Sequence, residues 1–365
     1  MSLEALAEIS RYYGKNPEYI LAGGGNTSFK DEDTLYVKGS GLSLADADAD
    51  SFVRMDRKAL ASIWVKQYPK GDGERESAVL ADMMAARKPG DENKRPSVEA
   101  LLHGILPFNF VVHLHPALVN GLTCSQYGEA AMKEIFGAKA IWIPSINPGY
   151  VLSKAVKTAM EDYCAVYNKP PAIIFLQNHG VFVGDDNVDG AKNIYSEIMD
   201  KIGERIKRQP DFSGENRRVS TPQVSVISVM LAEIAGASAF MQSSEVAAAV
   251  KDNISFASVS SAFTPDHIVY SGSDPLFIET ETLVKAALQE KSLQRAALFC
   301  LWENHIQKTG RKPKIVAVQD LGVFGVGATE KAASLALDLF KDTIKVSVIV
   351  IARCNIRNNI YYSGQ

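Results

Sequence analysis

The chain has 365 residues, of which 46% are hydrophobic and 22% charged, as in a globular protein and unlike a disordered one. A formal net charge of −3 argues against a cationic surface that binds nucleic acid along the whole chain. Four widely spaced cysteines, no membrane-length apolar run and no signal peptide predict a cytoplasmic protein that contacts neither membrane nor nucleic acid.

The first two hundred residues alternate between helical and strand patterns, which favours a layered α/β fold. In chain order, we expect a helix over 1–13, a glycine-rich turn over 21–30, a hairpin-like segment over 34–44, an amphipathic helix over 52–67, a loop over 87–97, a helix over 98–106, a strand over 109–115, a helix over 151–167, a strand over 172–177 with its turn at 178–180, and a helix over 190–206. Ser97 is a suitable N-cap for the helix over 98–106, and Pro107 ends that helix.

A basic, polar segment over 207–222 contains two prolines and interrupts this alternation. Such a composition is typical of a connection between domains. We therefore predict one domain over 1–206 and a second domain over 223–365.

Two segments of the chain resemble each other. IIFLQNHGVFVG at 173–184 aligns with IVAVQDLGVFGVG at 315–327, and each precedes an amphipathic helix of similar length. In this alignment, Leu321 stands where the first segment has His179. Two explanations are open: strand–turn–helix units resemble one another in general, or the second domain is a duplicate of the first that has lost its site.

The strand over 109–115 carries His113 and His115. Residues i and i+2 of a strand point to the same face, so both imidazoles can reach one metal ion. The rest of the strand is apolar, and two polar rings there are costly unless something satisfies them. A metal ion and hydrogen bonds within the core would both do so, and the pair alone fits either explanation.

His179 is a third candidate ligand, because it directly follows the strand over 172–177. Strand ends are where open α/β sheets present functional groups. Three neutral imidazoles would leave coordination positions open for substrate oxygens, as in a catalytic zinc site. We expect His103 to be structural, and His267 and His305 have no partner at metal-ligand spacing.

Glu99 is the candidate acid/base. It lies in the first turn of the predicted helix over 98–106, where the helix dipole alone also favours a carboxylate. Because that helix leads directly into the strand of His113, Glu99 can lie near the metal.

Two glycine-rich segments offer groups that bind anions. GGGNTS at 23–28 provides backbone amides with Asn26 and Thr27, and KGSG at 38–41 provides Lys38 and Ser40. Neither segment is a Walker loop or a dinucleotide-binding fingerprint. Taken alone, each fits a plain turn as well as a phosphate site.

Five motifs occur in a specific order over residues 23–184: GGGNTS, KGSG, RPSVEALLHGILP, VVHLHP and NHGVFVG. This order resembles the class II aldolase/adducin family, and within it most resembles the aldolase region of bifunctional rhamnulose-1-phosphate aldolase/lactaldehyde dehydrogenase proteins. TPDHIVYSG at 264–272 and the segment over 315–333 extend the resemblance into the second half. The sequence carries no Rossmann fingerprint, so we do not expect dehydrogenase activity of it.

The resemblance implies a three-layer α/β/α fold with a central mixed, mostly antiparallel sheet, followed here by a degenerate second copy. It implies Zn²⁺, or another divalent metal, held by His113, His115 and His179, with Glu99 as the catalytic residue. With Lys38 added from the KGSG segment, the expected phosphate-binding residues are Asn26, Thr27, Lys38, Ser40, Gly41 and Ser97. Fuculose-phosphate-type relatives tend to carry a second serine before the glutamate, where this chain has Val98, so some phosphate contacts are expected to differ.

The expected activity is metal-dependent cleavage of a ketose 1-phosphate, of the rhamnulose or fuculose type, to dihydroxyacetone phosphate and an aldehyde. We expect a homo-oligomer that acts on a small-molecule sugar phosphate. Alternatives are a phosphopentose 4-epimerase of the same family, where aspartate is expected at position 99, a decarboxylating member, and a non-catalytic adducin-like interaction protein. The last alternative predicts that the three histidines are missing, yet all three are present.

Overall fold

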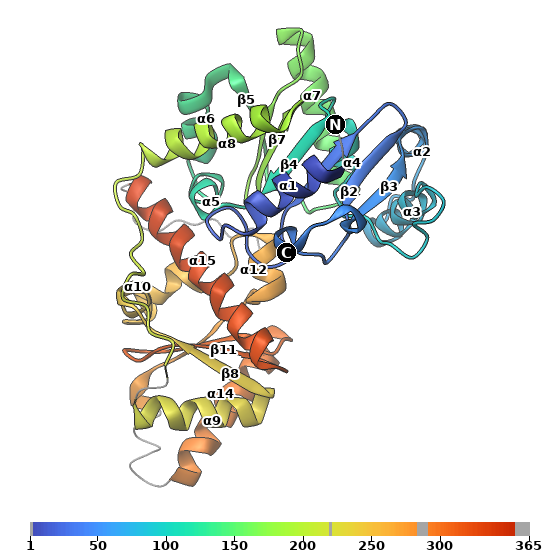
Figure 1. Ribbon diagram of the computed structural model, residues 1–365. Coiled ribbons are helices and arrows are strands. Elements are labelled where there is room, and N and C mark those ends of the chain that lie inside the picture. Colours follow the sequence, from blue (N-terminus) through green and yellow to red (C-terminus); the bar gives the residue numbers. More distant parts are fainter. Residues whose placement is uncertain (1–2, 219–220, 283–290, 355–365) are drawn as a thin grey trace. The chain divides into compact units, whose positions relative to one another are not determined.

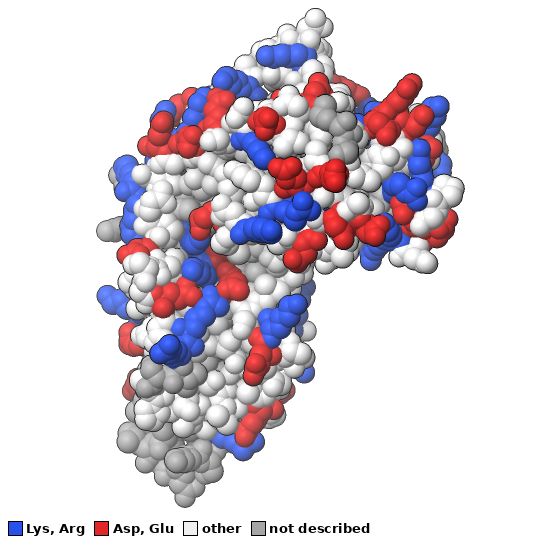
Figure 2. Space-filling model, viewed as in Figure 1, with Lys and Arg blue, Asp and Glu red and all other residues white. Residues whose placement is uncertain are grey.

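The computed structural model of the protein describes residues 3–218, 221–282 and 291–354, without the side chains of 291–294 and 350–354. The predicted second domain, 223–365, therefore includes residues 283–290 and 355–365, which lie outside the described part. None of the described helices is long and apolar enough to cross a membrane. Figure 2 shows basic and acidic side chains interspersed on the visible face, as expected from a net charge near zero.

The chain forms two compact units. The first comprises Met1–Thr123 with Tyr127–Arg205, and the second comprises Cys124–Gln126 with Ile206–Gln365. Each unit is built on its own sheet and is described by itself below.

A seven-stranded sheet forms the centre of the first unit, in the order β3-β2-β1-β4-β7-β6-β5 (Figure 1). Neighbouring strands are antiparallel except β5 and β6, which run parallel. The strands are β1 (Asn26–Lys30), β2 (Thr34–Lys38), β3 (Phe52–Asp56), β4 (Phe110–Leu114), β5 (Ala140–Ile143), β6 (Ile173–Leu176) and β7 (Gly180–Asp185). The prediction of a mixed, mostly antiparallel sheet is confirmed.

Helices cover both faces of this sheet, so the predicted three layers are confirmed. Helices α1, α5, α6 and α8 contribute to the apolar core on one face, and α2, α3, α4 and α7 to the cores on the other. Their bounds are α1 (Leu3–Gly14), α2 (Arg57–Ser62), α3 (Asp72–Ala85), α4 (Ala100–Ile105), α5 (Ala117–Thr123), α6 (Gly128–Phe136), α7 (Tyr150–Tyr167) and α8 (Val188–Gly203). Short 3₁₀ helices are η1 (Leu44–Asp46), η2 (Ala49–Ser51), η3 (Ile63–Val65) and η4 (Gly137–Lys139).

Strand β4 lies in the middle of the sheet and is buried along its whole length. Its alternate residues enter different cores: Phe110, Val112 and Leu114 pack with α1 and α8, while Val111 packs with α4 and α7. His113 shares the face of Val111 because successive strand residues alternate. The polar ring is thus directed into the layer that contains α4.

The structure corrects the predicted helix over 52–67. Residues Phe52–Asp56 form strand β3, which pairs with β2, and the short helix α2 begins only at Arg57. The carboxylate of Asp56 accepts a hydrogen bond from the Ala59 backbone N–H at 2.8 Å and caps this helix. The buried positions of the strand and of the helix together mimic a helical period, which is why apolar spacing alone did not separate them.

The second unit is a four-stranded sheet with helices on both faces. Its strand order is β8-β11-β10-β9. Helices α9 and α14 contribute to the core on one face, and α10 and α15 contribute to the core on the other (Figure 1). The strands are β8 (Ala237–Met241), β9 (Leu276–Ile278), β10 (Ile315–Val318) and β11 (Gly322–Gly327). The helices are α9 (Pro222–Ala235), α10 (Ser244–Ala249), α11 (Asn253–Phe256), η5 (Ala257–Val259), α12 (Pro265–Tyr270), α14 (Lys291–Thr309) and α15 (Glu330–Cys354).

The second sheet repeats part of the first. Strands β4-β7-β6-β5 and β8-β11-β10-β9 have the same order, the same connectivity and the same directions. The turns at Asn178 and Asp320 both have positive φ, at 57° and 58°, although neither residue is glycine. The two sheets therefore agree in strand topology and also in the backbone conformation of this turn.

Lys30 is a buried lysine on strand β1, and its ammonium group donates hydrogen bonds to the Leu106 and Phe108 carbonyls. Burial, with Arg57 as a smaller cause, lowers the pKa of Lys30 to about 7. An unfolded lysine has a pKa of about 10.4, so between these values the unfolded chain carries a proton that the folded chain lacks. Stability should therefore rise with pH in this range, and below pH 7 the cost of the buried charge is fully present.

We accordingly expect the free energy of unfolding of the wild type, relative to Lys30→Met, to rise between pH 7 and 9. The slope can reach about 1.4 kcal/mol per pH unit for one proton. Urea unfolding of both proteins at several pH values measures it. Parallel pH profiles for the two proteins would show that Lys30 keeps an ordinary pKa.

Candidate metal centre

Three histidines converge at one end of strand β4. His113 lies in β4, His115 follows it, and His179 lies in the turn between β6 and β7. One nitrogen from each lies within 4.8 Å of the others. The His113 Nε2 atom is 2.9 Å from Nε2 of His115 and 3.4 Å from Nε2 of His179. Nitrogens bound to one tetrahedral zinc ion lie about 3.3 Å apart, so the spacing fits a metal centre.

Local backbone structure brings His179 to this point. Asn178 adopts the left-handed conformation, with φ of 57°, and the backbone N–H of His179 donates to the Leu176 carbonyl at 3.2 Å. The chain thereby reverses tightly and re-enters the sheet as β7. His113 and His115 need only their i and i+2 positions to share a face.

His113 is held in the form that a metal requires. Its ring is fully buried, and Nδ1 lies 3.1 Å from the Val181 carbonyl, to which it can donate only if it carries the proton. This tautomer leaves Nε2 free of a proton and directed at the other two rings. Burial, followed by the neighbouring His115 and His179, lowers the pKa of His113 well below its usual value, which keeps the ring neutral.

The Glu99 carboxylate points into the same centre. Its Oε1 atom lies 3.4 Å from Nε2 of His113 and 3.4 Å from Nε2 of His179, and the side chain is buried. Its Oε2 atom accepts a hydrogen bond from Nδ2 of Asn26 at 2.7 Å. The predicted proximity of Glu99 to the histidines is therefore present in the structure.

The helix that carries this residue begins later than predicted. Glu99 itself is the N-cap, and α4 starts at Ala100. The predicted cap, Ser97, instead accepts a hydrogen bond from the Glu99 backbone N–H at 3.2 Å. Ser97 therefore shapes the turn before the helix, and this turn aims the carboxylate toward the histidines.

Two of the predicted phosphate-binding residues, Lys38 and Ser97, lie in adjoining segments. The Ser97 backbone N–H donates to the Lys38 carbonyl at 3.1 Å, which joins the turn before α4 to the end of β2. The Lys38 ammonium donates to the carbonyls of Gly23 and Leu42, at 2.9 and 2.7 Å. Lys38 thus ties the GGGNTS segment to the KGSG segment, and its positive charge lies between them.

The other predicted phosphate-binding residues differ in position. Ser40 and Gly41 lie exposed in the turn after β2, and Asn26 faces Glu99 from the start of β1. The structure does not bring the Thr27 hydroxyl to this set: it lies 2.7 Å from Oγ of Ser10 in helix α1, on the other face of the sheet. Adjacent residues of a strand point to opposite faces, so the side chains of Asn26 and Thr27 cannot both reach one site.

Residues 4–201 match the family described as class II aldolase and adducin N-terminal domain, which is more than half of the chain. The chain belongs to this family. Class II aldolases use a divalent metal, and in this family member such an ion fits the histidine group, in which His113 and His179 are buried and His115 is half-buried.

Individual relatives are more distant. An uncharacterized oxidoreductase of Bacillus subtilis (strain 168), YuxG, is 23% identical over 380 residues, covering 94% of this chain. This chain spans 53% of the length of that relative. The solved N-terminal class II aldolase domain of a Thermoplasma acidophilum protein is 25% identical and covers 56% of this chain and 93% of its own, with a TM-score of 0.47. L-fuculose-1-phosphate aldolase of Thermus thermophilus is 13% identical and covers 55% of this chain and 90% of its own, with a TM-score of 0.35.

One contact next to Glu99 was not anticipated from the sequence. His103, expected to be merely structural, is fully buried and forms a hydrogen bond with Asn26, the same residue that binds Glu99. Its spacing from Glu99, four positions along the chain, was a usable signal, because residues i and i+4 share a helix face.

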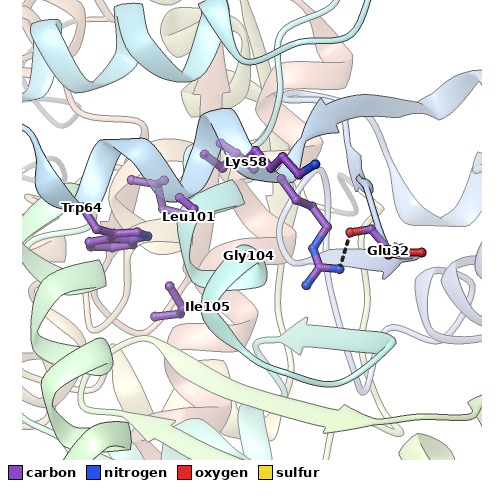
Figure 3. Close-up of a pocket in the computed structure, with 9 residues that line it drawn as sticks. Glu32, Lys58, Trp64, Leu101, Gly104 and Ile105 are labelled. Carbon is purple, nitrogen blue, oxygen red and sulfur yellow. Dashed lines mark hydrogen bonds between the residues drawn. The ribbon is translucent and has the colours of Figure 1, made fainter.

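A cavity of about 360 Å³ is lined in part by helix α4, and Figure 3 shows its lining side chains. Leu101, Gly104 and Ile105 contribute to it, and on a helical wheel they oppose Glu99 and His103. Its remaining lining residues are Glu32, Arg57, Lys58, Leu60, Ala61 and Trp64. None of the predicted site residues is among these described lining residues, so this cavity is separate from the metal centre.

Gly180 is required by the close approach of β7 to the metal centre. A Cβ atom there would lie 2.5 Å from the Leu114 carbonyl oxygen and 2.6 Å from Cδ2 of His115. We therefore expect Gly180→Ala to displace the His115 ring and to weaken metal binding about 10- to 100-fold, as loss of a ligand-orienting partner does.

Metal titration of purified protein measures this effect. Gly203→Ala is the matched control, because a Cβ at Gly203 meets nothing within 4 Å. Equal affinities of the two variants would mean that the position of the His115 ring does not matter for the ion.

Proposed function

We propose that this protein is a metal-dependent aldolase that cleaves a ketose 1-phosphate, of the rhamnulose or fuculose type, to dihydroxyacetone phosphate and an aldehyde. The observation that carries this proposal is the convergence of a buried carboxylate, Glu99, with three imidazole nitrogens. Membership in the class II aldolase and adducin family supports it. The two glycine-rich segments next to Glu99 supply the chemistry of an anion site.

His113, His115 and His179 would hold the cation, for which we propose Zn²⁺ because imidazole nitrogens suit it. When bound, the cation would act as a Lewis acid on the carbonyl of the substrate. Three protein ligands would leave room for substrate oxygens. The neutral state of His113 and its fixed tautomer both fit this role.

Glu99 would move the proton at the carbon adjacent to the carbonyl. Its Oε1 atom faces the centre, while Asn26 holds Oε2. A carboxylate with one oxygen held and the other directed at the three histidines would be positioned to act as a general base on a substrate bound there. Its burial excludes the water that would compete for the proton.

The substrate phosphate would bind between the KGSG turn and the turn before α4. The Ser40 hydroxyl, the Gly41 amide and the Ser97 hydroxyl are the donors there. Because Lys38 is engaged with two carbonyls, it would contribute its charge over a distance and hold the turns in place. Binding of a remote phosphate positions the reacting carbons, which is a large part of catalysis.

The second unit is proposed to be a degenerate copy of the first domain, with the boundary between the two domains at residues 207–222 of the chain. The sheet pairing aligns His113 with Phe240, because each pairs with the equivalent phenylalanine of the next strand, Phe182 or Phe324. The third histidine position is Leu321. The copy would therefore lack the ligands of a metal centre.

A panel of rhamnulose, fuculose and ribulose 1-phosphates, assayed with added divalent metal, tests the proposal through release of dihydroxyacetone phosphate. We expect cleavage of at least one of them by a homo-oligomeric, cytoplasmic enzyme. Interconversion of a phosphopentose without cleavage would instead identify a 4-epimerase. Failure to turn over any sugar phosphate with metal bound would overturn the proposal and favour a decarboxylating or non-catalytic member.

A further inference from the structure

A chain of hydrogen bonds joins helix α4 to the Glu99 carboxylate through the sheet. Nδ1 of His103 lies 2.7 Å from Oγ of Ser28, and Nε2 of His103 is hydrogen-bonded to Oδ1 of Asn26. Nδ2 of Asn26 in turn donates to Oε2 of Glu99 at 2.7 Å. All four side chains are buried, so water cannot readily substitute for any partner.

The donor and the acceptor of every hydrogen bond in this series follow from the Glu99 carboxylate at its end. The proposed base is an ionised carboxylate, which only accepts, so Asn26 presents its NH₂ group to Glu99 and its carbonyl oxygen to His103. That oxygen also only accepts, so Nε2 of His103 carries the proton. Nδ1 is then bare and accepts from the Ser28 hydroxyl. Each donor in the chain therefore points toward Glu99.

A neutral histidine suits this position better than other residues. Burial, followed by Lys30 and Lys38, lowers the pKa of His103 well below its usual value, which keeps one nitrogen as an acceptor. The ring can thus accept from Ser28 on one side and donate to Asn26 on the other. Without the Nε2–H group, the Asn26 amide could turn over and present its oxygen to the carboxylate, which would repel it.

We propose that His103 is a positioning residue that fixes the orientation of the Asn26 amide and, through it, directs the Glu99 carboxylate at the metal centre. The proposal rests on the proposed role of Glu99 as the acid/base. His103 would touch neither substrate nor metal. It would act because the orientation of a catalytic group depends on the partners that hold it.

The tautomer gives a test that does not depend on activity. Nitrogen-15 NMR of the histidine side chains in the purified protein should show His103 with a proton on Nε2 and none on Nδ1. A proton on Nδ1 would overturn the proposal, because the bond to Asn26 would then have no donor. This result holds or fails whether or not the protein turns over a sugar phosphate.

Variants test the consequence. His103→Phe keeps the ring and removes both nitrogens, and the rate of proton exchange on dihydroxyacetone phosphate should fall about 10- to 100-fold at saturation. KM and metal content should stay close to the wild-type values. His103→Gln, which keeps a donor and an acceptor, should recover part of the rate and also serves if the Phe variant does not fold.

Two further variants separate positioning from a general effect on helix α4. Gly104→Ala lies on the opposite side of the helix, where its Cβ would make only ordinary contacts, 3.9 Å from Leu60 Cδ1 and 4.0 Å from Leu35 Cδ2, and should leave the rate unchanged. Asn26→Ala should cost about as much as His103→Phe, and the double variant should cost little more than either. Additive losses, or loss of metal in His103→Phe, would overturn the proposal.

An inactive wild type would have a different meaning. If the wild-type protein with metal bound exchanged no proton of dihydroxyacetone phosphate, the proposed function would fail. The NMR result would then still decide the orientation of Asn26, so the two failures are distinguishable.

Discussion

Glu99→Gln is expected to lose exchange of the dihydroxyacetone phosphate protons with solvent while it keeps its metal. The amide has nearly the shape of the carboxylate and can still accept a hydrogen bond from Asn26, but it cannot take up a proton. General acid–base catalysis contributes about 10²- to 10⁴-fold, so a loss within this range is expected. Incubation in D₂O, followed by proton NMR of the hydroxymethyl carbon, measures the exchange directly.

The same chemical change on the surface provides the control. Glu129 of helix α6 is exposed and pairs with Lys133 at 2.7 Å, so Glu129→Gln should exchange at the wild-type rate. Normal exchange in Glu99→Gln would show that another group moves the proton. Loss of metal together with exchange would instead make Glu99 a metal ligand.

The sequence was sufficient to predict the layered fold, but it misassigned two segments of the first unit: residues 26–30, expected within a turn, form strand β1, and the predicted helix over 52–67 begins with strand β3. The helices over 1–13 and 151–167 have long amphipathic patterns, and α1 and α7 confirm them. The prediction of a helix over residues 52–67 was wrong because a strand of five residues and a helix of six follow one another without a turn signal. Pairing of β3 with β2, which is a tertiary contact, decided the strand.

The site shows the same division between local and tertiary information. His113 and His115 could be predicted as a pair, because strand geometry alone places them on one face. The contacts that orient Glu99 could not be predicted from the sequence, because Asn26 and Glu99 lie 73 positions apart in the chain. Thr27 shows that a motif match names a residue without saying which face it occupies: the hydroxyl of Thr27 turns to Ser10.

His113→Ala is expected to lose the metal ion. Its Nε2 atom lies between the other two rings, at 2.9 and 3.4 Å, so its removal leaves only two imidazoles, too few for a stable site. Loss of a partner that merely orients a ligand costs about 10- to 100-fold in affinity, so the loss of the ligand itself should exceed about 100-fold. Metal analysis after dialysis measures this, and added zinc should raise the melting temperature of the wild type only.

His179→Ala is the second variant for this prediction, because the His113 ring also stacks on Phe182 and its loss could disturb the core. His267→Gln is the control: this histidine is equally buried, but it pairs with Asp342 in the second unit. The control should keep its metal. Retention of the ion by both His113→Ala and His179→Ala would show that the metal binds elsewhere.

The stoichiometry of the wild type adds a constraint from the second unit. There the position of His113 is occupied by Phe240, and that of His179 by Leu321, so neither side chain can donate a nitrogen to a metal. We therefore expect one metal ion per chain and not two. A second equivalent that survives dialysis and persists in His113→Ala would contradict the assignment of the second unit as a copy without a site.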